Sequence, residues 1–138
     1  TAVSKDAAVF EAYMEARRLP RDTEQQKSER EMAIHTASIN AADVPMQVAY
    51  GALEILRLAL KAASLGNVNA ISDSGAAGAL ALAALEGAGY NVRINLIGME
   101  DETGPSRMLA DLAALEKDAR EIHDSIRQVL HDRGGLGR

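Results

Sequence analysis

A run of small residues near the middle of the chain most strongly limits how it can fold. The segment from Ser74 to Tyr90 is SGAAGALALAALEGAGY, so alanine, glycine and leucine fill nearly every position. Wound as an α-helix, it would carry glycine or alanine on almost every face, and neighbouring helices could approach it closely on more than one side. A helix of this kind belongs in the middle of a helical bundle.

The composition favours the same architecture. The chain has 138 residues, of which 47% are hydrophobic and only 3% aromatic, with no tryptophan. A core built from alanine, leucine, isoleucine, valine and methionine suits closely packed helices better than a sandwich of sheets. The length is that of one domain. We therefore expect a single all-α domain over residues 1–133 and a flexible tail at residues 134–138.

Hydrophobic periodicity and cap residues predict about five helices. The first ends at the segment RLPRDT, because proline moves the residue before it out of helical geometry. Thr23 and Gln26 form a capping box at the start of the second helix, which continues to about Asn40. Pro45 suits the first position of a third helix, and Gly66 provides its C-terminal stop.

The fourth helix contains the run of small residues. It is expected to begin at Ser74, with Ser72 or Asp73 as its cap. The following segment NVRINLI alternates like a strand but has no second strand to pair with, so continued helix is expected. Apolar residues recur at intervals of three and four from Met108 to Val129, which predicts a long fifth helix. The expected architecture is a bundle of about five helices, completed by a dimer partner or by missing N-terminal helices.

Charge and cysteine content exclude several classes of partner. The net charge is −5 and no block of lysine and arginine occurs, so the chain has no obvious means of attracting a phosphate backbone. The longest apolar run is far shorter than the roughly 20 residues that a membrane-spanning helix needs. The absence of cysteine fits a reducing compartment. We expect a cytoplasmic protein that binds neither nucleic acid nor membrane.

No metal site is expected. The three histidines, His35, His123 and His131, show none of the spacings that are typical of metal ligands, and surface positions are expected for them. The acidic residues mostly lie on predicted solvated helix faces, where pairing with lysine or arginine is their default role. Asp6 is kept as a weaker candidate for chemistry.

Two polar segments, GNVNAISD and YNVRIN, contain the candidates for a binding site. Their six side chains are Asn67, Asn69, Ser72, Asp73, Asn91 and Asn95. The first four converge on a helix N-terminus, which offers free N–H donors and a partial positive charge. Together the six could line one polar pocket. The structural alternative is that the first segment only turns and caps, although one cap suffices and four polar residues are present.

Ordered segments of the chain resemble the cyclodeaminase/cyclohydrolase family. They are DAAVFEAYMEARRLPRDT, VPMQVA, GNVNAISDSGAA and NVRINL, and the likeness extends from Asp6 to about Asp101. The GN-x-N-x-x-SD and NV-x-IN pieces are its most specific part. The resemblance implies a helical homodimer that binds tetrahydrofolate derivatives in a cleft between helices. It also implies further helices and a glycine-rich stretch before the matched part, which this sequence does not contain.

The resemblance implies one of two reactions, neither of which needs a prosthetic group or a metal. A formimidoyltetrahydrofolate cyclodeaminase converts 5-formiminotetrahydrofolate to 5,10-methenyltetrahydrofolate and ammonia. The alternative, a methenyltetrahydrofolate cyclohydrolase, opens the same methenyl bridge with water. A second alternative is a helical module that binds folate or dimerises without catalysis. The motifs do not distinguish the two reactions.

Asp73 is the first candidate for a catalytic residue. A carboxylate can transfer protons between the reacting nitrogens or oxygens, a contribution of about 10²–10⁴-fold. It can instead accept paired hydrogen bonds from N3 and the 2-amino group of the pterin. The residues expected to bind the substrate are Asn67, Asn69, Ser72, Asn91, Asn95 and, with less support, Asp6.

Overall fold

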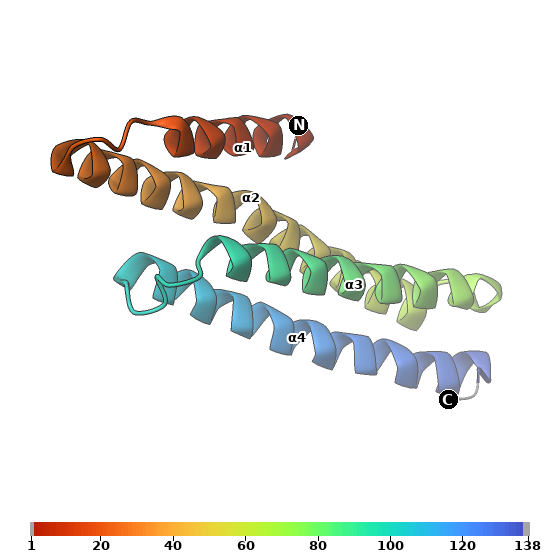
Figure 1. The fold of residues 1–138 in the computed structure, drawn as a ribbon. Helices are drawn as coiled ribbons and strands as arrows, with labels where there is room; N and C mark the ends of the chain where they lie inside the picture. The colour runs from red at the N-terminus through yellow and green to blue at the C-terminus, as the bar shows by residue number, and fades with distance from the viewer. Residues whose placement is uncertain (1, 137–138) are drawn as a thin grey trace.

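The computed structural model describes residues 2–136, with side chains described from residue 7 onward. Its regular structure consists of α-helices and one short 3-10 helix, and no strand occurs in this part of the chain (Figure 1). The elements in order are α1 (Ala2–Arg18), α2 (Glu24–Leu65), η1 (Val68–Ala70), α3 (Ile71–Asn95) and α4 (Thr103–Gly134). The predicted all-α helical bundle is confirmed.

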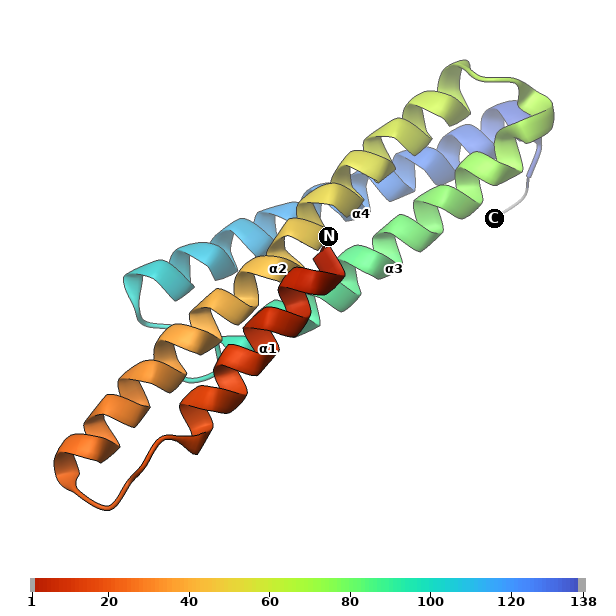
Figure 2. The same ribbon diagram turned by 90° about the horizontal axis from the view of Figure 1, so that it is seen from above.

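Three long helices form the body of the bundle. α2 and α3 run antiparallel and are joined by the short segment that contains η1, and α4 lies along both of them (Figures 1 and 2). α1 lies along the first half of α2. The largest fully buried side chains all come from α2, α4 and the segment from α3 to the residue after it: Leu56, Leu85, Val92, Leu96, Leu112 and Ile126. The core is therefore aliphatic, as the composition predicts.

α2 is one continuous helix of 42 residues, so the prediction of two helices separated before Pro45 is wrong. A proline inside a helix leaves the carbonyl four residues earlier, here that of Ala41, without its N–H partner. The Nδ2 atom of Asn95 lies 3.4 Å from this carbonyl oxygen and donates to it. Pro45 and its neighbour Met46 are buried in the bundle. Tertiary packing and a substitute hydrogen bond therefore keep the helix intact.

The predicted ends of α2 are confirmed. At its start, the N–H of Gln26 donates to Oγ1 of Thr23 and the N–H of Thr23 donates to Oε1 of Gln26, both at 3.2 Å, which completes the capping box. At its end, the N–H of Gly66 donates to the carbonyl of Ala62 at 2.8 Å. A Cβ on Gly66 would lie 2.5 Å from that carbonyl oxygen, so glycine suits this stop.

Two glycines of α3 let α4 approach closely. A Cβ on Gly75 would lie 2.7 Å from Cδ1 of Leu130, and one on Gly78 would lie 2.8 Å from Cδ1 of Ile126. The opposite side of α3 is open to solvent, and Leu80 on that side is 72% exposed. The small residues thus permit close packing with α4, and α3 also packs along α2, while its remaining side is exposed in the described part of the chain.

Candidate functional site

The polar break between α2 and α3 folds as a 3-10 turn followed directly by a helix. Oδ1 of Asn67 accepts a hydrogen bond from the N–H of Asn69 at 3.0 Å and caps η1. α3 begins at Ile71, and Ala70 occupies its N-cap position without a side-chain bond. The prediction that Ser72 or Asp73 caps this helix is therefore wrong, because the 3-10 turn starts the helix earlier.

This correction leaves Asp73 available for another role. Its carboxylate lies in the first turn of α3, where backbone N–H groups lack helical partners and the helix dipole is positive. Asp73 and Ser72 are exposed, and neither side chain makes a hydrogen bond within residues 7–136. The side chain of Asn69 is likewise exposed and unengaged in that range. Three polar groups therefore stand free at one helix start.

Arg133 of α4 fastens this polar segment to the rest of the bundle. Its guanidinium donates to the carbonyl of Ala63 and, at 3.2 Å, to that of Gly66. Ala63 lies in the last turn of α2 and Gly66 is its C-cap residue, and carbonyls at a helix end lack helical N–H partners. Sequence reasoning did not find Arg133. Its two partners, Ala63 and Gly66, precede it by 70 and 67 positions in the sequence, and the contacts depend on how α4 packs against α2.

Asn91 and Asn95 lie at the other end of α3 and bond mainly to the backbone. Nδ2 of Asn91 donates to the carbonyl of Gly87 at 3.1 Å. Nδ2 of Asn95 donates to the carbonyl of Asn91 at 2.9 Å and also reaches Ala41, as described above. Asn95 is half-buried and tied to α2, whereas Asn91 is exposed. The polar role of Asn95 is therefore at least partly structural.

The six candidate residues do not form one pocket within a single chain. Asp73 and Asn91 are 18 residues apart in α3, which corresponds to a separation of about 27 Å along the helix axis. Eighteen residues are also about five full helical turns, so both side chains point to the same side of α3. The side chain of Asp6 lies outside the described residues. The site is thus divided between the two ends of one helix.

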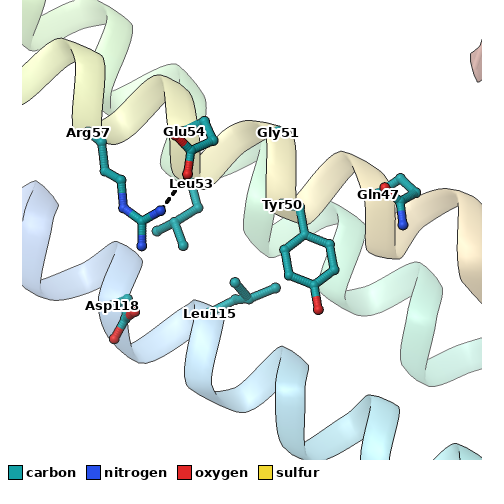
Figure 3. A pocket seen from close by; sticks show the side chains of 8 residues that line it. All are labelled: Gln47, Tyr50, Gly51, Leu53, Glu54, Arg57, Leu115 and Asp118. Atoms are coloured by element: carbon teal, nitrogen blue, oxygen red, sulfur yellow. Dashed lines mark hydrogen bonds and ion pairs between the residues drawn. The ribbon is translucent and has the colours of Figure 1, made fainter.

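A shallow hollow of about 430 Å³ lies elsewhere, between α2 and α4 (Figure 3). Its lining residues are Gln47, Tyr50, Gly51, Leu53, Glu54, Arg57, Leu115 and Asp118. Arg57 is paired with Glu54 and extends from α2 toward α4, where Asp118 lies. Sequence reasoning named none of these residues as candidates. Since the charged groups at the hollow are exposed and Arg57 is paired with Glu54, we assign no chemistry to it.

An ion pair joins the later part of α3 to α4. Nη1 and Nη2 of Arg93 donate to the two carboxylate oxygens of Glu116 at 2.7 and 2.8 Å. The hydrogen bond from Arg93 lowers the pKa of Glu116, and the same bond raises the pKa of Arg93. Nearby, the N–H of Gly98 donates to the exposed Glu100 and lowers the pKa of that carboxyl. The Arg93–Glu116 pair thus joins α3 to α4, whereas the contact between Gly98 and Glu100 is local to the segment between these helices.

The histidines of the described residues do not form a cluster of metal ligands. His35 contacts Glu102 at the start of α4, with 2.7 Å between Nε2 and a carboxylate oxygen. Among the side chains that the structure describes, no three histidine, aspartate or glutamate residues are placed to hold a metal ion.

Comparisons with known proteins connect the whole arrangement to one family. The family model described as "Formiminotransferase-cyclodeaminase" matches residues 1–130. A methenyltetrahydrofolate cyclohydrolase of Methylorubrum extorquens is 33% identical over 128 residues, which cover 93% of this chain and 62% of that protein. The formimidoyltransferase-cyclodeaminase of Sus scrofa is 30% identical over 86% of this chain and 22% of its own length. That of Gallus gallus is 32% identical over 80% and 21%. The chain thus spans less than two thirds of each relative.

Proposed function

Because the chain belongs to the formiminotransferase-cyclodeaminase family, we propose that it acts in folate one-carbon metabolism, on the carbon carried between N5 and N10 of tetrahydrofolate. The match of the family model to residues 1–130 carries this proposal. Relatives with two different names, a cyclohydrolase and several cyclodeaminases, share this folate chemistry. The substrate proposed here is therefore a tetrahydrofolate derivative.

The first proposed reaction is the cyclodeaminase step, which the family description favours. N10 attacks the formimino carbon on N5, and a new carbon–nitrogen bond gives a tetrahedral carbon. The N10 proton passes to the former imino nitrogen. That nitrogen takes up a second proton and leaves as ammonia, and the 5,10-methenyl cation remains. The step requires a group that receives and returns protons, and it needs no change of oxidation state.

Asp73 is the residue we propose for this role. It is an exposed carboxylate without a partner in residues 7–136, at a helix start with free N–H groups. As a general acid and base it would contribute about 10²–10⁴-fold to the rate. As a pterin anchor it would instead bind N3 and the 2-amino group in a paired, charge-assisted contact. Asn69 and Ser72 would orient the substrate beside it.

The second candidate function is the cyclohydrolase step. The observation that favours it is the 33% identity to the Methylorubrum extorquens enzyme over 93% of this chain. In this reaction water adds to the methenyl carbon and one of its protons is released, which gives a neutral hydroxyl adduct. The remaining hydroxyl proton then passes to N5 as the bond from the carbon to N5 breaks, and the formyl group stays on N10. Ammonia release from 5-formiminotetrahydrofolate, set against decay of the methenyl absorbance, distinguishes the two reactions. A protein that binds folate but does neither would be the non-catalytic module.

Three further properties are part of the proposal. We expect the protein to act as a homodimer, to carry no prosthetic group and to work in the cytoplasm. The dimer and the folate substrate follow the family resemblance, and the acidic net charge supports the expectation that nucleic acid is not a partner.

The test of Asp73 compares matched substitutions of exposed aspartates. Asp73→Asn should lower kcat/KM by about 10²-fold or more, while the midpoint of thermal unfolding stays within about 2 °C because no contact is lost. Asp111→Asn on the exposed side of α4 should change neither quantity. A fall in kcat alone indicates proton transfer, and a rise in KM alone indicates the pterin anchor. Full activity of Asp73→Asn would remove Asp73 from the site.

A further inference from the structure

The last turn of α4 contacts both ends of the polar segment. This segment, residues 66–73, leads from the end of α2 through η1 into the first turn of α3. On the α2 side, the guanidinium of Arg133 donates to two carbonyls at the helix end. On the α3 side, Gly134 lies against Ile71, which is the first residue of that helix and is buried. Two successive residues of α4 therefore hold the segment from its two ends.

The close contact with Ile71 depends on glycine at position 134. A Cβ on Gly134 would lie 3.0 Å from Cγ2 of Ile71 and 3.4 Å from Cγ of Leu136. Ile71 is only 5% exposed, and its β-branched side chain has little freedom to move aside. One turn further along the same interface, a Cβ on Gly75 would lie 2.7 Å from Cδ1 of Leu130. The separation between α4 and the start of α3 is therefore set by residues that lack side chains.

The turn of α4 that makes these contacts has a defined end. Gly135 adopts the left-handed conformation, with a φ of 64°, which favours glycine. Its N–H donates to the carbonyl of His131 at 3.1 Å, and the N–H of Leu136 donates to that of Leu130 at 3.2 Å. These bonds satisfy carbonyls that a helix end leaves without helical partners. α4 thus meets the polar segment with a hydrogen-bonded helix end.

α3 is held in the bundle by its packed side. By length and composition alone, the stretch Val68–Asn95 could cross a membrane, as core helices can. Its packed side, however, supplies Leu85 and Val92 to the aliphatic core, while Leu80 on its remaining side is 72% exposed in the described residues. The start of α3 is therefore restrained from the side of α2 and α4.

Asp73 depends on these contacts for its place. It lies two residues after Ile71 in the first turn of α3, and its carboxylate makes no hydrogen bond within residues 7–136. The position of the carboxylate is therefore set by the backbone at the helix start. That backbone is held by the last turn of α4.

We propose that the last turn of α4 positions the candidate site, with Arg133 and Gly134 as positioning residues that act through Asp73. The catalytic consequence rests on the proposed function, whereas the contacts of the polar segment do not. A displacement of about 1 Å can cost about 100-fold in rate, so small shifts of the helix start should be visible in the kinetics. The overall stability should change less, because the aliphatic core lies along α2, α3 and α4 and Arg133 is exposed.

The kinetics of a double variant test whether Arg133 acts through Asp73. Arg133→Ala should lower kcat/KM of the 138-residue chain by about 10-fold or more, and should change the same constant, kcat or KM, that Asp73→Asn changes. Once Asp73 is replaced, its position no longer matters, so the addition of Arg133→Ala to Asp73→Asn should cause little further loss. Losses that multiply fully in the double variant would overturn the proposal, since Arg133 would then act independently of Asp73.

Chemical rescue separates positioning from general stabilisation. Guanidinium chloride at about 20 mM, far below the concentrations that unfold proteins, should raise the activity of Arg133→Ala several-fold. The free ion can donate to the carbonyls that the substitution leaves unpaired, whereas sodium chloride at the same concentration cannot. Guanidinium lowers folding stability, so a variant that was merely destabilised would lose further activity. Absence of rescue for Arg133→Ala, or an equal gain for the exposed control Arg127→Ala, contradicts the proposal.

Two glycines of α4 provide a matched pair for the contact with Ile71. Gly134→Ala should lower kcat/KM several-fold, because the new methyl group displaces Ile71 and with it the first turn of α3. Gly104→Ala places the same methyl group where nothing lies within 4 Å, and should leave activity unchanged. Circular dichroism should show the same helix content for both, since alanine favours a helix more than glycine does. Equal kcat/KM for the two variants contradicts a positioning role for Gly134.

Hydrogen exchange measures the hold on the polar segment without reference to catalysis. In Arg133→Ala, the amides of residues 66–73 should exchange at least about 10-fold faster than in the wild-type chain, while those around Leu112 stay protected. If this happens but the wild-type chain acts on neither folate substrate, the proposed reaction is wrong and the hold of α4 on the segment is supported. If the wild-type chain is active and Arg133→Ala keeps its exchange rates, kcat and KM, α4 does not position the segment and the reaction is supported.

Discussion

Three asparagine side chains near the ends of α3 are hydrogen-bonded to the backbone, whereas the carboxylate of Asp73 is not. Asn67 caps η1, Asn91 bonds to the carbonyl of Gly87, and Asn95 bonds to carbonyls on α3 and α2. Such contacts explain why amides occur at these positions without any reference to a ligand. Removal of Asp73 would cost the fold little, which makes it the residue whose presence most needs a chemical explanation.

The Arg93–Glu116 pair gives a prediction about pH. Because the folded-state pKa of Glu116 is below its unfolded value, the pair stabilises the fold above the unfolded pKa of about 4.3 and is lost as pH falls through the folded pKa. Arg93 is 44% exposed, so the effect should be below about 1 kcal/mol. Urea unfolding of wild type and Glu116→Gln should differ at pH 7 and converge as the pH falls through the folded-state pKa of Glu116. A difference that is constant with pH would contradict this, and Glu11→Gln, an exposed change on α1, should give no difference.

Arg133 provides a second prediction at this scale. Arg133→Ala removes two charge-assisted hydrogen bonds to carbonyls at the end of α2, and should lower the free energy of unfolding by about 1–2 kcal/mol. It should also reduce activity, since the segment that contains Asn69 and Asp73 would no longer be held against α4 by these hydrogen bonds. Arg127→Ala, on an exposed part of the same helix, is the control. An unchanged urea midpoint for Arg133→Ala would show that these two hydrogen bonds contribute nothing measurable to the free energy of unfolding.

At the scale of elements, the two ends of α2 were predictable from sequence, whereas its continuity and the start of α3 were not. Thr23, Gln26 and Gly66 act through neighbours within four residues, so their effect can be inferred from local sequence. Pro45 suggests a helix start by the same local rules. Its actual place inside α2 depends on Asn95, which is 50 positions away in sequence. Local rules fail where a distant side chain supplies the missing hydrogen bond.

This explanation predicts an energetic coupling between Asn95 and Pro45. Asn95→Ala should destabilise the wild-type chain by about 1 kcal/mol, because the Ala41 carbonyl loses its donor. In a Pro45→Ala background the backbone N–H of residue 45 can bond to Ala41, and the same substitution should cost less. A double-mutant cycle from urea unfolding measures this difference. Additive effects of the two changes would show that Asn95 does not serve the carbonyl freed by Pro45.

On the scale of the whole molecule, α1 is attached more weakly than the other helices. Within residues 7–18 only Ala16 is buried. The guanidinium of Arg30 ties the end of α1 to α2 through the carbonyl of Arg17, at 3.2 and 3.1 Å. By contrast, α2, α3 and α4 share one continuous aliphatic core. α1 is therefore expected to open without unfolding the rest of the bundle.

Hydrogen exchange tests this expectation. Backbone amides of α1 should exchange at least about 100-fold faster than those around Leu56, Leu85 and Leu112, because local opening requires less free energy than global unfolding. Mass spectrometry of peptic fragments resolves the regions. Equal protection of α1 and the core would mean that α1 unfolds only together with the bundle.

Only part of the candidate site could be predicted from the sequence. The residue types in the polar break and the family that they indicate were accessible from the motifs alone. The assumption that Asn91 joins Asp73 in one pocket fails for a single chain, because both lie on one rigid helix and their separation is fixed at about 27 Å. Arg133 could not be found, since its role follows from the way α4 returns to the end of α2.

The uninterrupted α2 limits which insertions and deletions the protein can accept during evolution. A helix of 42 residues keeps a fixed angular relation between its two ends, with about 100° of rotation for each residue. Insertion or deletion of one residue near Pro45 would turn the half that supports the polar segment out of phase with the half that carries α1. Lineages of this chain should therefore tolerate length changes in the segments between helices and reject them within α2.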